Sequence, residues 1–396
     1  MKGLLLVVFV NFVGVGALIP VLPYAVIDEA GGSEFSMAML MASFALAMFV
    51  GSPILGSVSD RIGRKKVLIA SILITSLGYL VFALTTNLAL MFISRIISGL
   101  ASGNISVVHA IITDNTKPDQ RARWMGLMGA SVGLGFVAGP ALGGLLSGLG
   151  GAVHMAPFLV ASGLAFLGMT FCQFFVEESS RPDPKMRLPL AERWQDFLAS
   201  GLGGFAVAVF LLNLAFAQVE VSFVLVMKDV LGFTSMNTGW VFTWIGVLIV
   251  IIQGGLIGPI TAWIGDMGTA LAGAVFLGAG QLMTMSLIPL EFVVLGSSVA
   301  GVMLATTFVC VGFALTNPTL ASASSKRARQ GKIGGSIGLV QGFGSLGQVS
   351  GLILAGPLYE MGGGSLTFGT GGVICCGLVL SNLWIILRAK SIHLDR

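Results

Sequence analysis

Two charged side chains lie inside long apolar stretches of the sequence, Arg95 in the first half of the chain and Glu220 in the second. A charge at the centre of a membrane helix costs about 2.5–3.5 kcal/mol on insertion scales, so such residues usually serve a function. A buried carboxyl group can bind and release a proton, and a guanidinium group can pair with it or with another anion. Asn213 lies seven residues before Glu220, on the same helical face.

The expected depths of Arg95 and Glu220 agree. Counted from the expected outer ends of their segments, near Asn87 and Met227, the two residues lie about 12 Å and about 10 Å deep at the rise of an α-helix. We therefore expect Glu220 and Arg95 to attract each other across a cavity, and protonation of Glu220 to release them. A structural ion pair, or an anchor for a bound molecule without a role for protons, would explain the same placement.

The composition indicates what kind of protein holds these charges. Of its 396 residues, 55% are hydrophobic and 10% are charged, whereas roughly a quarter are charged in soluble domains. The mean hydropathy is +0.96, and a soluble domain this apolar could not cover itself with polar surface. The basic residues are spread over short loops, which does not favour nucleic-acid binding. The cysteines lie in apolar stretches without disulfide or metal-ligand spacing, so we expect no metal and no cofactor.

Twelve apolar segments have about the twenty residues that a bilayer core requires. They lie near residues 3–26, 35–57, 66–86, 88–112, 122–147, 155–176, 203–227, 237–257, 268–288, 292–317, 332–358 and 366–388. The longest polar stretch separates the sixth segment from the seventh. We therefore predict an all-α membrane protein of twelve transmembrane helices in two pseudo-symmetric six-helix bundles, residues 1–176 and 203–396, joined by a cytoplasmic linker at 177–202.

The two predicted halves repeat each other weakly. Residues 56–63, after the second segment, are similar to residues 258–265, after the eighth. Ala-Gly-Pro occurs at 138–140 in the fifth segment and at 355–357 in the eleventh. Parallel halves joined by a linker are the layout in which a site between them opens alternately to either side of a membrane.

Several motifs resemble those of the major facilitator superfamily. Residues 56–66 (GSVSDRIGRKK) match its loop 2–3 signature, and residues 90–103, around Arg95, are similar to its span 4 motif. The stretches 14–23 and 114–126 are similar to tetracycline/proton antiporters. The antiporter pattern G-x8-G-x3-GP-x2-GG is complete in span 5, at Gly126, Gly135, Gly139, Pro140, Gly143 and Gly144. The resemblance is dense over residues 11–180 and architectural beyond them.

This resemblance implies a secondary transporter in a bacterial plasma membrane that exports a small amphipathic organic compound in exchange for protons. The expected partners are this substrate, protons and bilayer lipids, and the chain is expected to act as a monomer. In the superfamily, spans 1, 4, 7 and 10 line the central cavity. Besides Arg95 and Glu220, the expected cavity residues are Asn11, Asn213, Phe216, Gln218, Thr306 and Asn317.

For loop 2–3 the resemblance implies a conformational latch. Its residues are Gly56, Asp60, Arg61, Gly63, Arg64 and Asp114, and Arg64 is expected to pair with Asp114. Anchoring by the positive-inside rule would explain the basic residues, but not Asp60 among them. The second half has Ala262 and Asp266 at the positions of Asp60 and Arg64, so we expect the latch in the first half only.

The glycines of span 5 have a physical interpretation of their own. Gly135, Gly139 and Gly143 recur every four residues and form a bare stripe that lets another helix approach closely. Pro140 is expected to bend the span. We expect this stripe at the moving interface between the two halves, although static packing inside one half would use the same residues.

One difference from the family pattern bears on proton coupling. Asn11 stands where tetracycline antiporters have an aspartate in span 1, and an amide cannot bind and release a proton. Either the proton site has moved, which leaves Glu220 as the candidate carboxyl group, or the protein is not coupled to protons. A proton-linked symporter or a uniporter for a small metabolite is therefore an alternative. A membrane enzyme or sensor is disfavoured, because the sequence has no catalytic cluster or appended soluble domain.

The basic residues predict the orientation. With the amino terminus inside, all 21 Lys and Arg residues except Arg95 and Lys228 fall in inner loops or at the termini, as the positive-inside rule requires. A reporter fused after Arg396 should therefore be cytoplasmic, and one inserted in the Asp28–Glu34 loop should be external. An external carboxyl terminus would exclude the twelve-span count.

Overall fold

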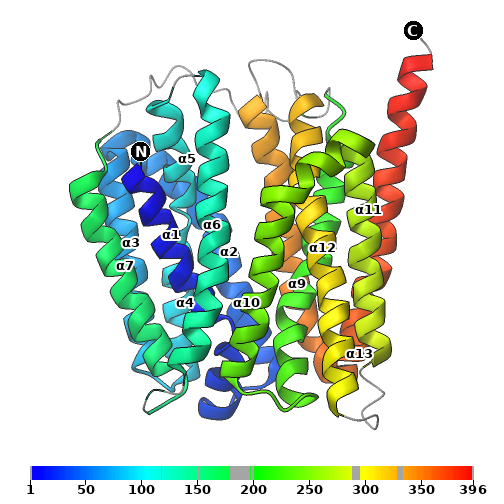
Figure 1. The fold of residues 1–396 in the computed structure, drawn as a ribbon. Helices are drawn as coiled ribbons and strands as arrows, with labels where there is room; N and C mark the ends of the chain where they lie inside the picture. The colour runs from blue at the N-terminus through cyan, green and yellow to red at the C-terminus, as the bar shows by residue number, and fades with distance from the viewer. Residues whose placement is uncertain are drawn as a thin grey trace. The chain divides into compact units, whose positions relative to one another are not determined.

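The computed structural model describes residues 2–116, 118–147, 149, 151–178, 197, 200–287, 295–327 and 333–394, and these residues form helices and loops without a β-strand (Figure 1). The helices of the first half are α1 (Lys2–Leu18), the π-helix η1 (Tyr24–Glu29), α2 (Glu34–Ile62), α3 (Arg64–Ala83), α4 (Leu88–Ser102), α5 (Ile105–Asp114), α6 (Pro118–Leu146) and α7 (Met155–Phe175). Those of the second half are α9 (Gly203–Asp229), α10 (Ser235–Ile251), the π-helix η3 (Ile252–Leu256), α11 (Ile257–Leu287), α12 (Leu295–Arg327) and α13 (Ile333–Leu394).

Nine helical segments in the described part of the chain are long and apolar enough to cross a membrane. Two of them, Ser235–Leu287 and Gly338–Arg388, run to 53 and 51 residues. Each contains a glycine with positive φ that breaks the helix, Gly265 at 74° and Gly363 at 61°. Each long segment thus holds two spans, and together with the shorter apolar helix at Gly3–Leu18 the structure is consistent with twelve.

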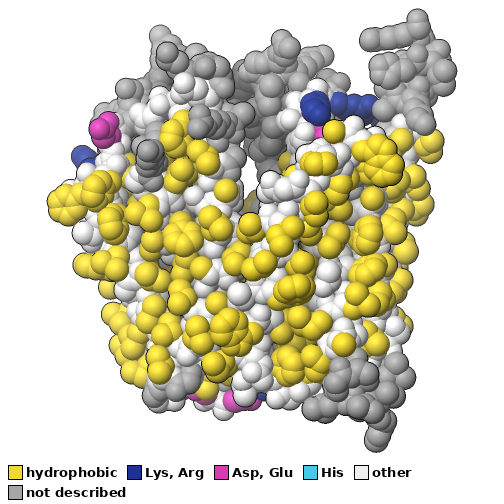
Figure 2. Space-filling view, in the orientation of Figure 1, with side chains coloured by type: hydrophobic (Ala, Val, Ile, Leu, Met, Phe, Trp, Pro, Cys, Tyr) yellow, Lys and Arg dark blue, Asp and Glu magenta, His cyan; other side chains and the backbone are white. Residues whose placement is uncertain are grey.

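The outer surface has the composition of a membrane protein. On the face seen in Figure 2, hydrophobic side chains cover the helices, and charged side chains gather near helix ends. Large apolar residues such as Phe174, Val373 and Leu380 are 65–77% exposed. Contiguous apolar surface of this kind is unstable in water and is expected where helices face lipid. The chain is therefore a multi-pass membrane protein.

The chain divides into two compact units. The first comprises residues 1–186 together with Gly232–Gly246, and the second comprises residues 187–231 and 247–396. The helix α10 thus contributes its first part to the first unit and its end to the second. In the first unit, α1 packs against α6 and α7, α3 against α7 and α4, and α2 against α4. In the second unit, α9 packs along α13, and α11 packs against α12 and α13.

The glycine stripe of α6 packs on α1. A Cβ atom built at Gly139 would lie 2.7 Å from Val13 O and 2.7 Å from Gly16 Cα, and one at Gly143 would overlap Ala17 O. The two backbones therefore touch, which only glycine permits. This finding corrects the expectation that the stripe lies at an interface between the halves, because its partner α1 belongs to the same unit.

A different face of α6 contacts the first part of α10, inside the same unit. A Cβ atom at Gly144 would lie 3.0 Å from Gly239 Cα, and one at Gly246 would lie 2.6 Å from Val137 Cγ2. At the end of this contact the Ser235 hydroxyl donates to Ser147 Oγ at 2.6 Å. The two helices thus stay in backbone contact over about three turns.

Glycine contacts fix the second unit in the same way. On α13, a Cβ atom at Gly347 would overlap Phe210 O of α9, and one at Gly351 would lie 2.5 Å from Leu214 O. Between α11 and α12, a Cβ atom at Gly280 would lie 2.7 Å from Ala305 O. The helix α9 is consequently buried along most of its length, and its few partly exposed positions stand out.

One end of the first unit is tied by His154, at the start of α7. Its Nδ1 atom contacts the Glu29 carboxylate of η1, and its Nε2 atom lies 3.1 Å from Thr85 O. The ring is buried, edge-on to Phe82 and Phe158. The sequence analysis did not single out this residue, although a histidine beside an apolar helix start is a polar group that needs partners.

The glycine contacts predict opposite effects for two substitutions on α6. Gly143→Ala should lower the melting temperature of the purified protein, because the new methyl group overlaps Ala17 O and overpacking costs about 1–3 kcal/mol. Gly133→Ala is the matched control, because a Cβ atom there would meet nothing within 4 Å. Replacing a helical glycine by alanine at an open position gains up to about 1 kcal/mol, so this variant should keep or raise the melting temperature. Equal shifts for both variants would contradict the proposed packing.

Candidate functional site

Arg95 is buried inside the first unit without an ion-pair partner among the described residues. Its side chain extends from α4, is 6% exposed, and carries its guanidinium carbon 4.2 Å from the centroid of the Phe44 ring. Contact with an aromatic face stabilises a cation by about 0.5–2 kcal/mol. The Nε and Nη1 atoms have no hydrogen-bond partner within the described part of the chain. Since an unpaired buried donor is costly, this group is suited to bind an acceptor.

Other buried polar atoms of the first unit also lack a hydrogen-bond partner among the described residues. The hydroxyls of Ser98 and Ser102, three and seven residues beyond Arg95 on α4, are buried, and no described residue bonds to them. The same holds for the Tyr79 hydroxyl on α3 and for Asn11 Oδ1 on α1. Buried polar groups are normally paired, so unpaired ones indicate a place where water or a ligand binds.

In the second unit, three expected cavity residues share the partly exposed face of α9. Asn213, Phe216 and Glu220 are partly exposed on a helix that is otherwise largely buried. The Phe216 ring stacks on Phe313 of α12, with centroids 3.8 Å apart. Glu220 Oε2 accepts a hydrogen bond of 3.4 Å from Gln348 Nε2 of α13. The arrangement combines a flat aromatic surface with a single carboxyl group.

The other expected cavity residues of this unit lie differently. Gln218 is 2% exposed, and its Oε1 accepts from the Thr370 hydroxyl at 3.2 Å, so it is turned into the interior of the unit. Thr306 is also buried, and its hydroxyl donates to Val302 O. Asn317 is partly exposed on α12, one turn beyond Phe313. Gln348 and Phe313 were missed by the sequence analysis, because a neutral amide and an aromatic residue differ little from packing residues in an apolar span.

Arg95 and Glu220 belong to different units. Arg95 lies on α4 of the first unit and Glu220 lies on α9 of the second. The attraction expected between them therefore stays a prediction. Inside its own unit each has a weak partner, an aromatic ring for Arg95 and one amide for Glu220. Neither partner carries an opposite charge.

Loop 2–3 contains a compact cluster of charges. Gly63 ends α2 with φ of 115°, and Arg64 begins α3. The Arg64 guanidinium contacts the Asp60 carboxylate, donates to Asp114 Oδ2 at 3.1 Å, and donates to Ser59 Oγ at 2.8 Å. Arg64 is only 6% exposed, so these bonds replace its lost hydration. The cluster joins α2, α3 and the end of α5.

The remaining residues expected in the latch lie at the edge of this cluster. Arg61 is exposed, and Gly56 lies beside Ser106, whose oxygen a Cβ atom at Gly56 would approach to 3.5 Å. Glu178, which the sequence analysis did not single out, accepts from the Lys65 backbone N–H at 3.1 Å. A carboxylate at the start of a helix is favoured by the helix dipole. It ties the segment after α7 to loop 2–3.

The second half also has an ion pair at the corresponding loop, which the sequence analysis did not predict. That the latch lies in the first half only stays a prediction. Gly265 has φ of 74° where the first half has Gly63, and Asp266 follows it where the first half has Arg64. Asp266 Oδ2 accepts from Ser322 Oγ at 3.0 Å and from Lys326 Nζ at 2.5 Å. At this position the first half has a cation with carboxylate partners, and the second half has a carboxylate with a cationic partner. The sequence comparison, which looked for the same residue types, could not detect this.

Comparison with known proteins agrees with this architecture. Residues 4–351 match the Major Facilitator Superfamily. The chain belongs to this superfamily. Among its relatives, Multidrug resistance protein 2 of Bacillus subtilis (strain 168) is 30% identical over 392 residues, which cover 95% of this chain and 93% of that protein. The class C tetracycline resistance protein of Escherichia coli is 33% identical over 277 residues, which cover 67% and 68% of the two chains.

A solved structure supports the same fold for this superfamily member. The human organic anion transporter MFSD10 has a TM-score of 0.72 to this chain at 21% identity, and the match covers 96% of this chain and 98% of that one. Identity this low supports the fold alone.

The charge cluster of loop 2–3 predicts the effect of Asp60→Asn in this superfamily member. Asn keeps the size of the side chain, and Asp114 still neutralises Arg64, so the protein should insert and fold normally. The loss of one of the two carboxylates should nevertheless reduce flux per folded molecule several-fold. Lys66→Gln is the control, since it removes an exposed charge nearby on α3. If Asp60→Asn keeps the wild-type flux, loop 2–3 acts only as a topological anchor and not as a latch.

Proposed function

We propose that this chain exports small amphipathic, drug-like organic compounds across the plasma membrane in exchange for protons. The observation that carries the proposal is the partly exposed face of α9, where the carboxyl group of Glu220 lies one turn from the stacked rings of Phe216 and Phe313. Aromatic surface accepts apolar molecules of varied shape. A nearby carboxyl group provides both a proton site and an attraction for a cationic substrate. The resistance proteins similar to this chain support the same interpretation.

The polar content of the two units supports a hydrophobic substrate. The first unit contributes Arg95 and the buried hydroxyls beside it, and the second contributes Asn213 and Glu220. Ligand sites for apolar molecules are lined mostly by hydrophobic and aromatic residues with a few polar groups that fix orientation. A sugar or peptide would require more hydrogen-bonding partners than these residues supply.

In the proposed cycle, Glu220 alternates between a protonated state and a charged state that Arg95 attracts. Neither residue has an oppositely charged partner among the described residues of its own unit, so both are available for such an exchange. One proton moving inward gains about 2.3 kcal/mol per 100 mV of membrane potential, which is enough for modest accumulation of substrate. Loop 2–3 would hold the outward-facing state as a latch. The halves 1–176 and 203–396 would move about the linker, with both termini in the cytoplasm and one chain sufficient for transport.

A flux measurement tests the proposal directly. The purified protein would be reconstituted in sealed liposomes, and uptake of ethidium or tetracycline would be followed by fluorescence after a pH step across the membrane. Counterflow of protons should be visible with a pH-sensitive dye in the lumen. Substrate movement in the same direction as protons would favour the symporter, and movement indifferent to the pH step would favour the uniporter.

Substitution of Glu220 tests the coupling site. Glu220→Gln mimics the protonated carboxyl group and cannot release a proton, so it should abolish uphill transport driven by a pH gradient. Downhill exchange of substrate should stay measurable, because the aromatic surface is unchanged. The matched control is Glu34→Gln, at the first turn of α2, which should keep both activities. If Glu220→Gln still concentrates substrate against its gradient, Glu220 is not the coupling site.

A further inference from the structure

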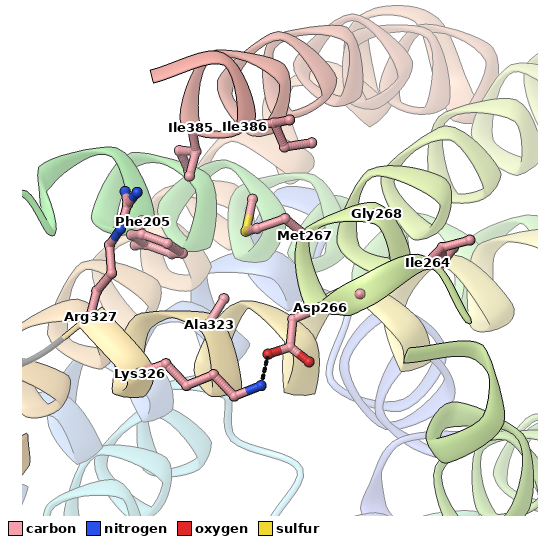
Figure 3. A pocket seen from close by; sticks show the side chains of 11 residues that line it. Phe205, Ile264, Asp266, Met267, Gly268, Ala323, Lys326, Arg327, Ile385 and Ile386 are labelled. Atoms are coloured by element: carbon pink, nitrogen blue, oxygen red, sulfur yellow. Dashed lines mark hydrogen bonds and ion pairs between the residues drawn. The ribbon is translucent and has the colours of Figure 1, made fainter. Parts of the chain in front are cut away.

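A cavity of about 470 Å³ opens at one end of the second unit, away from the carboxyl group of α9 (Figure 3). It lies beside the positive-φ glycine that breaks α11. Its lining comes from four helices, α9, α11, α12 and α13, and is largely apolar. The lining residues used below are Phe205, Asp266, Met267, Lys326, Arg327 and Ile386.

The charges of this pocket lie on one side, on α12 and at the break in α11. Lys326 points to Asp266, with which it forms the ion pair drawn in Figure 3. Arg327 points instead towards Phe205, and its guanidinium carbon lies 5.9 Å from the ring centroid. No ion pair is recorded for Arg327 among the described residues. The pocket therefore has an apolar floor and a net positive rim.

Its surroundings place the pocket at the level of a membrane interface. Trp263, next to the α11 break, is 85% exposed, and Trp384 on α13 is 49% exposed. Tryptophan is enriched where membrane helices meet the headgroups. Trp384 also packs on Gly204, beside Phe205, and carries Arg388 5.0 Å above its ring. By the positive-inside rule, this end faces the cytoplasmic leaflet, which carries the anionic lipids.

We propose that this pocket binds the phosphate head of an anionic phospholipid from the cytoplasmic leaflet. Arg327 and Lys326 would hold the phosphate, because a guanidinium and an ammonium form strong charge-assisted bonds to its oxygens. The apolar residues, among them Phe205, Met267 and Ile386, would contact the glycerol and the first acyl carbons. A small soluble anion would use the cationic rim but gain nothing from this floor.

The position of Asp266 predicts that its carboxylate weakens lipid binding. Its carboxylate holds Lys326 and repels an incoming phosphate, so lipid and Asp266 compete for the same ammonium group. Asp266 also accepts from Ser322, and so connects the break in α11 to α12. Binding of an anionic lipid would thus weaken the bonds by which Asp266 connects α11 to α12. These bonds are the counterpart, in the second half, of the charge cluster at loop 2–3.

Native mass spectrometry of the purified, detergent-solubilised protein tests this site without a transport assay. The probes are phosphatidylglycerol, phosphatidylcholine and sn-glycerol 3-phosphate, titrated into wild-type protein and three single variants. For wild-type protein, phosphatidylglycerol should bind about tenfold more tightly than phosphatidylcholine, because the choline cation of the latter is repelled by the net positive rim. Glycerol 3-phosphate should not displace it, because the head alone lacks the apolar contacts.

The variants separate a specific site from general surface charge. Arg327→Gln should weaken phosphatidylglycerol binding about tenfold, and Lys66→Gln, which removes an exposed cation of the first unit, should leave it unchanged. Asp266→Asn should tighten binding, because it frees Lys326 and removes the repulsion. A folding defect in Asp266→Asn would weaken binding instead. Tighter binding by this variant would therefore support the site even if Arg327→Gln is unstable.

Four outcomes would overturn the proposal. Equal binding of the two phospholipids would show that the net charge of the headgroup does not matter, and displacement by glycerol 3-phosphate would show a site for a free anion. Equal losses in Arg327→Gln and Lys66→Gln would show an unspecific charge effect. A dimer that dissociates in Arg327→Gln would show that a second copy of the chain, and not a lipid, occupies the pocket.

Discussion

Backbone contact between helices at glycine is the interaction on which the rest of this structure depends. Inside a bilayer the hydrophobic effect does not drive helices together, so their association relies on close packing and on hydrogen bonds. Glycine permits that packing where α6 meets α1 and where α13 meets α9, with carbonyl oxygens of one helix against the bare Cα atoms of the other. The polar side chains of the spans keep defined positions because these contacts fix the helices that carry them.

The charges of the protein fall into two groups that differ in how firmly they are held. At the helix ends, Arg64 has two carboxylates and Asp266 has an ammonium and a hydroxyl, so each charge has a fixed place. Inside the spans, Arg95 faces an aromatic ring and Glu220 faces one amide. A charge without a counter-charge at low dielectric is expensive and readily exchanges its partner. The first group suits a latch between states, and the second suits a step in which a partner is gained or lost.

Sequence reasoning predicted the helical membrane fold and the superfamily, because hydropathy and the glycine-rich motifs depend on local residue types. It placed Asn213 and Glu220 on one face because helical spacing determines the face, and the structure shows Phe216 partly exposed on the same face. Sequence spacing does not show which helix packs on a given face. The glycine stripe of α6 was therefore assigned to a moving interface, whereas in the structure α1 packs on it. Gln218 is two residues from Phe216 and Glu220, and that spacing turns it into the unit. The charge-exchanged pair of Asp266 and Lys326 escaped a comparison that sought identical residues.

The chain passes between the two units at residues 186/187, inside the polar linker that joins the halves of the sequence, and again at 231/232. A third boundary falls inside α10, between Gly246 and Val247, so a single continuous helix belongs to both units. Cutting the chain in the linker would therefore leave each fragment tied to the other through the contact of α6 with α10. The π-helix η3 follows at once and contains Gly254 and Gly255, neither of which has a neighbour within 4 Å of its Cβ position. An irregular helical turn with two glycines that lack near neighbours therefore directly follows the helix that the two units share.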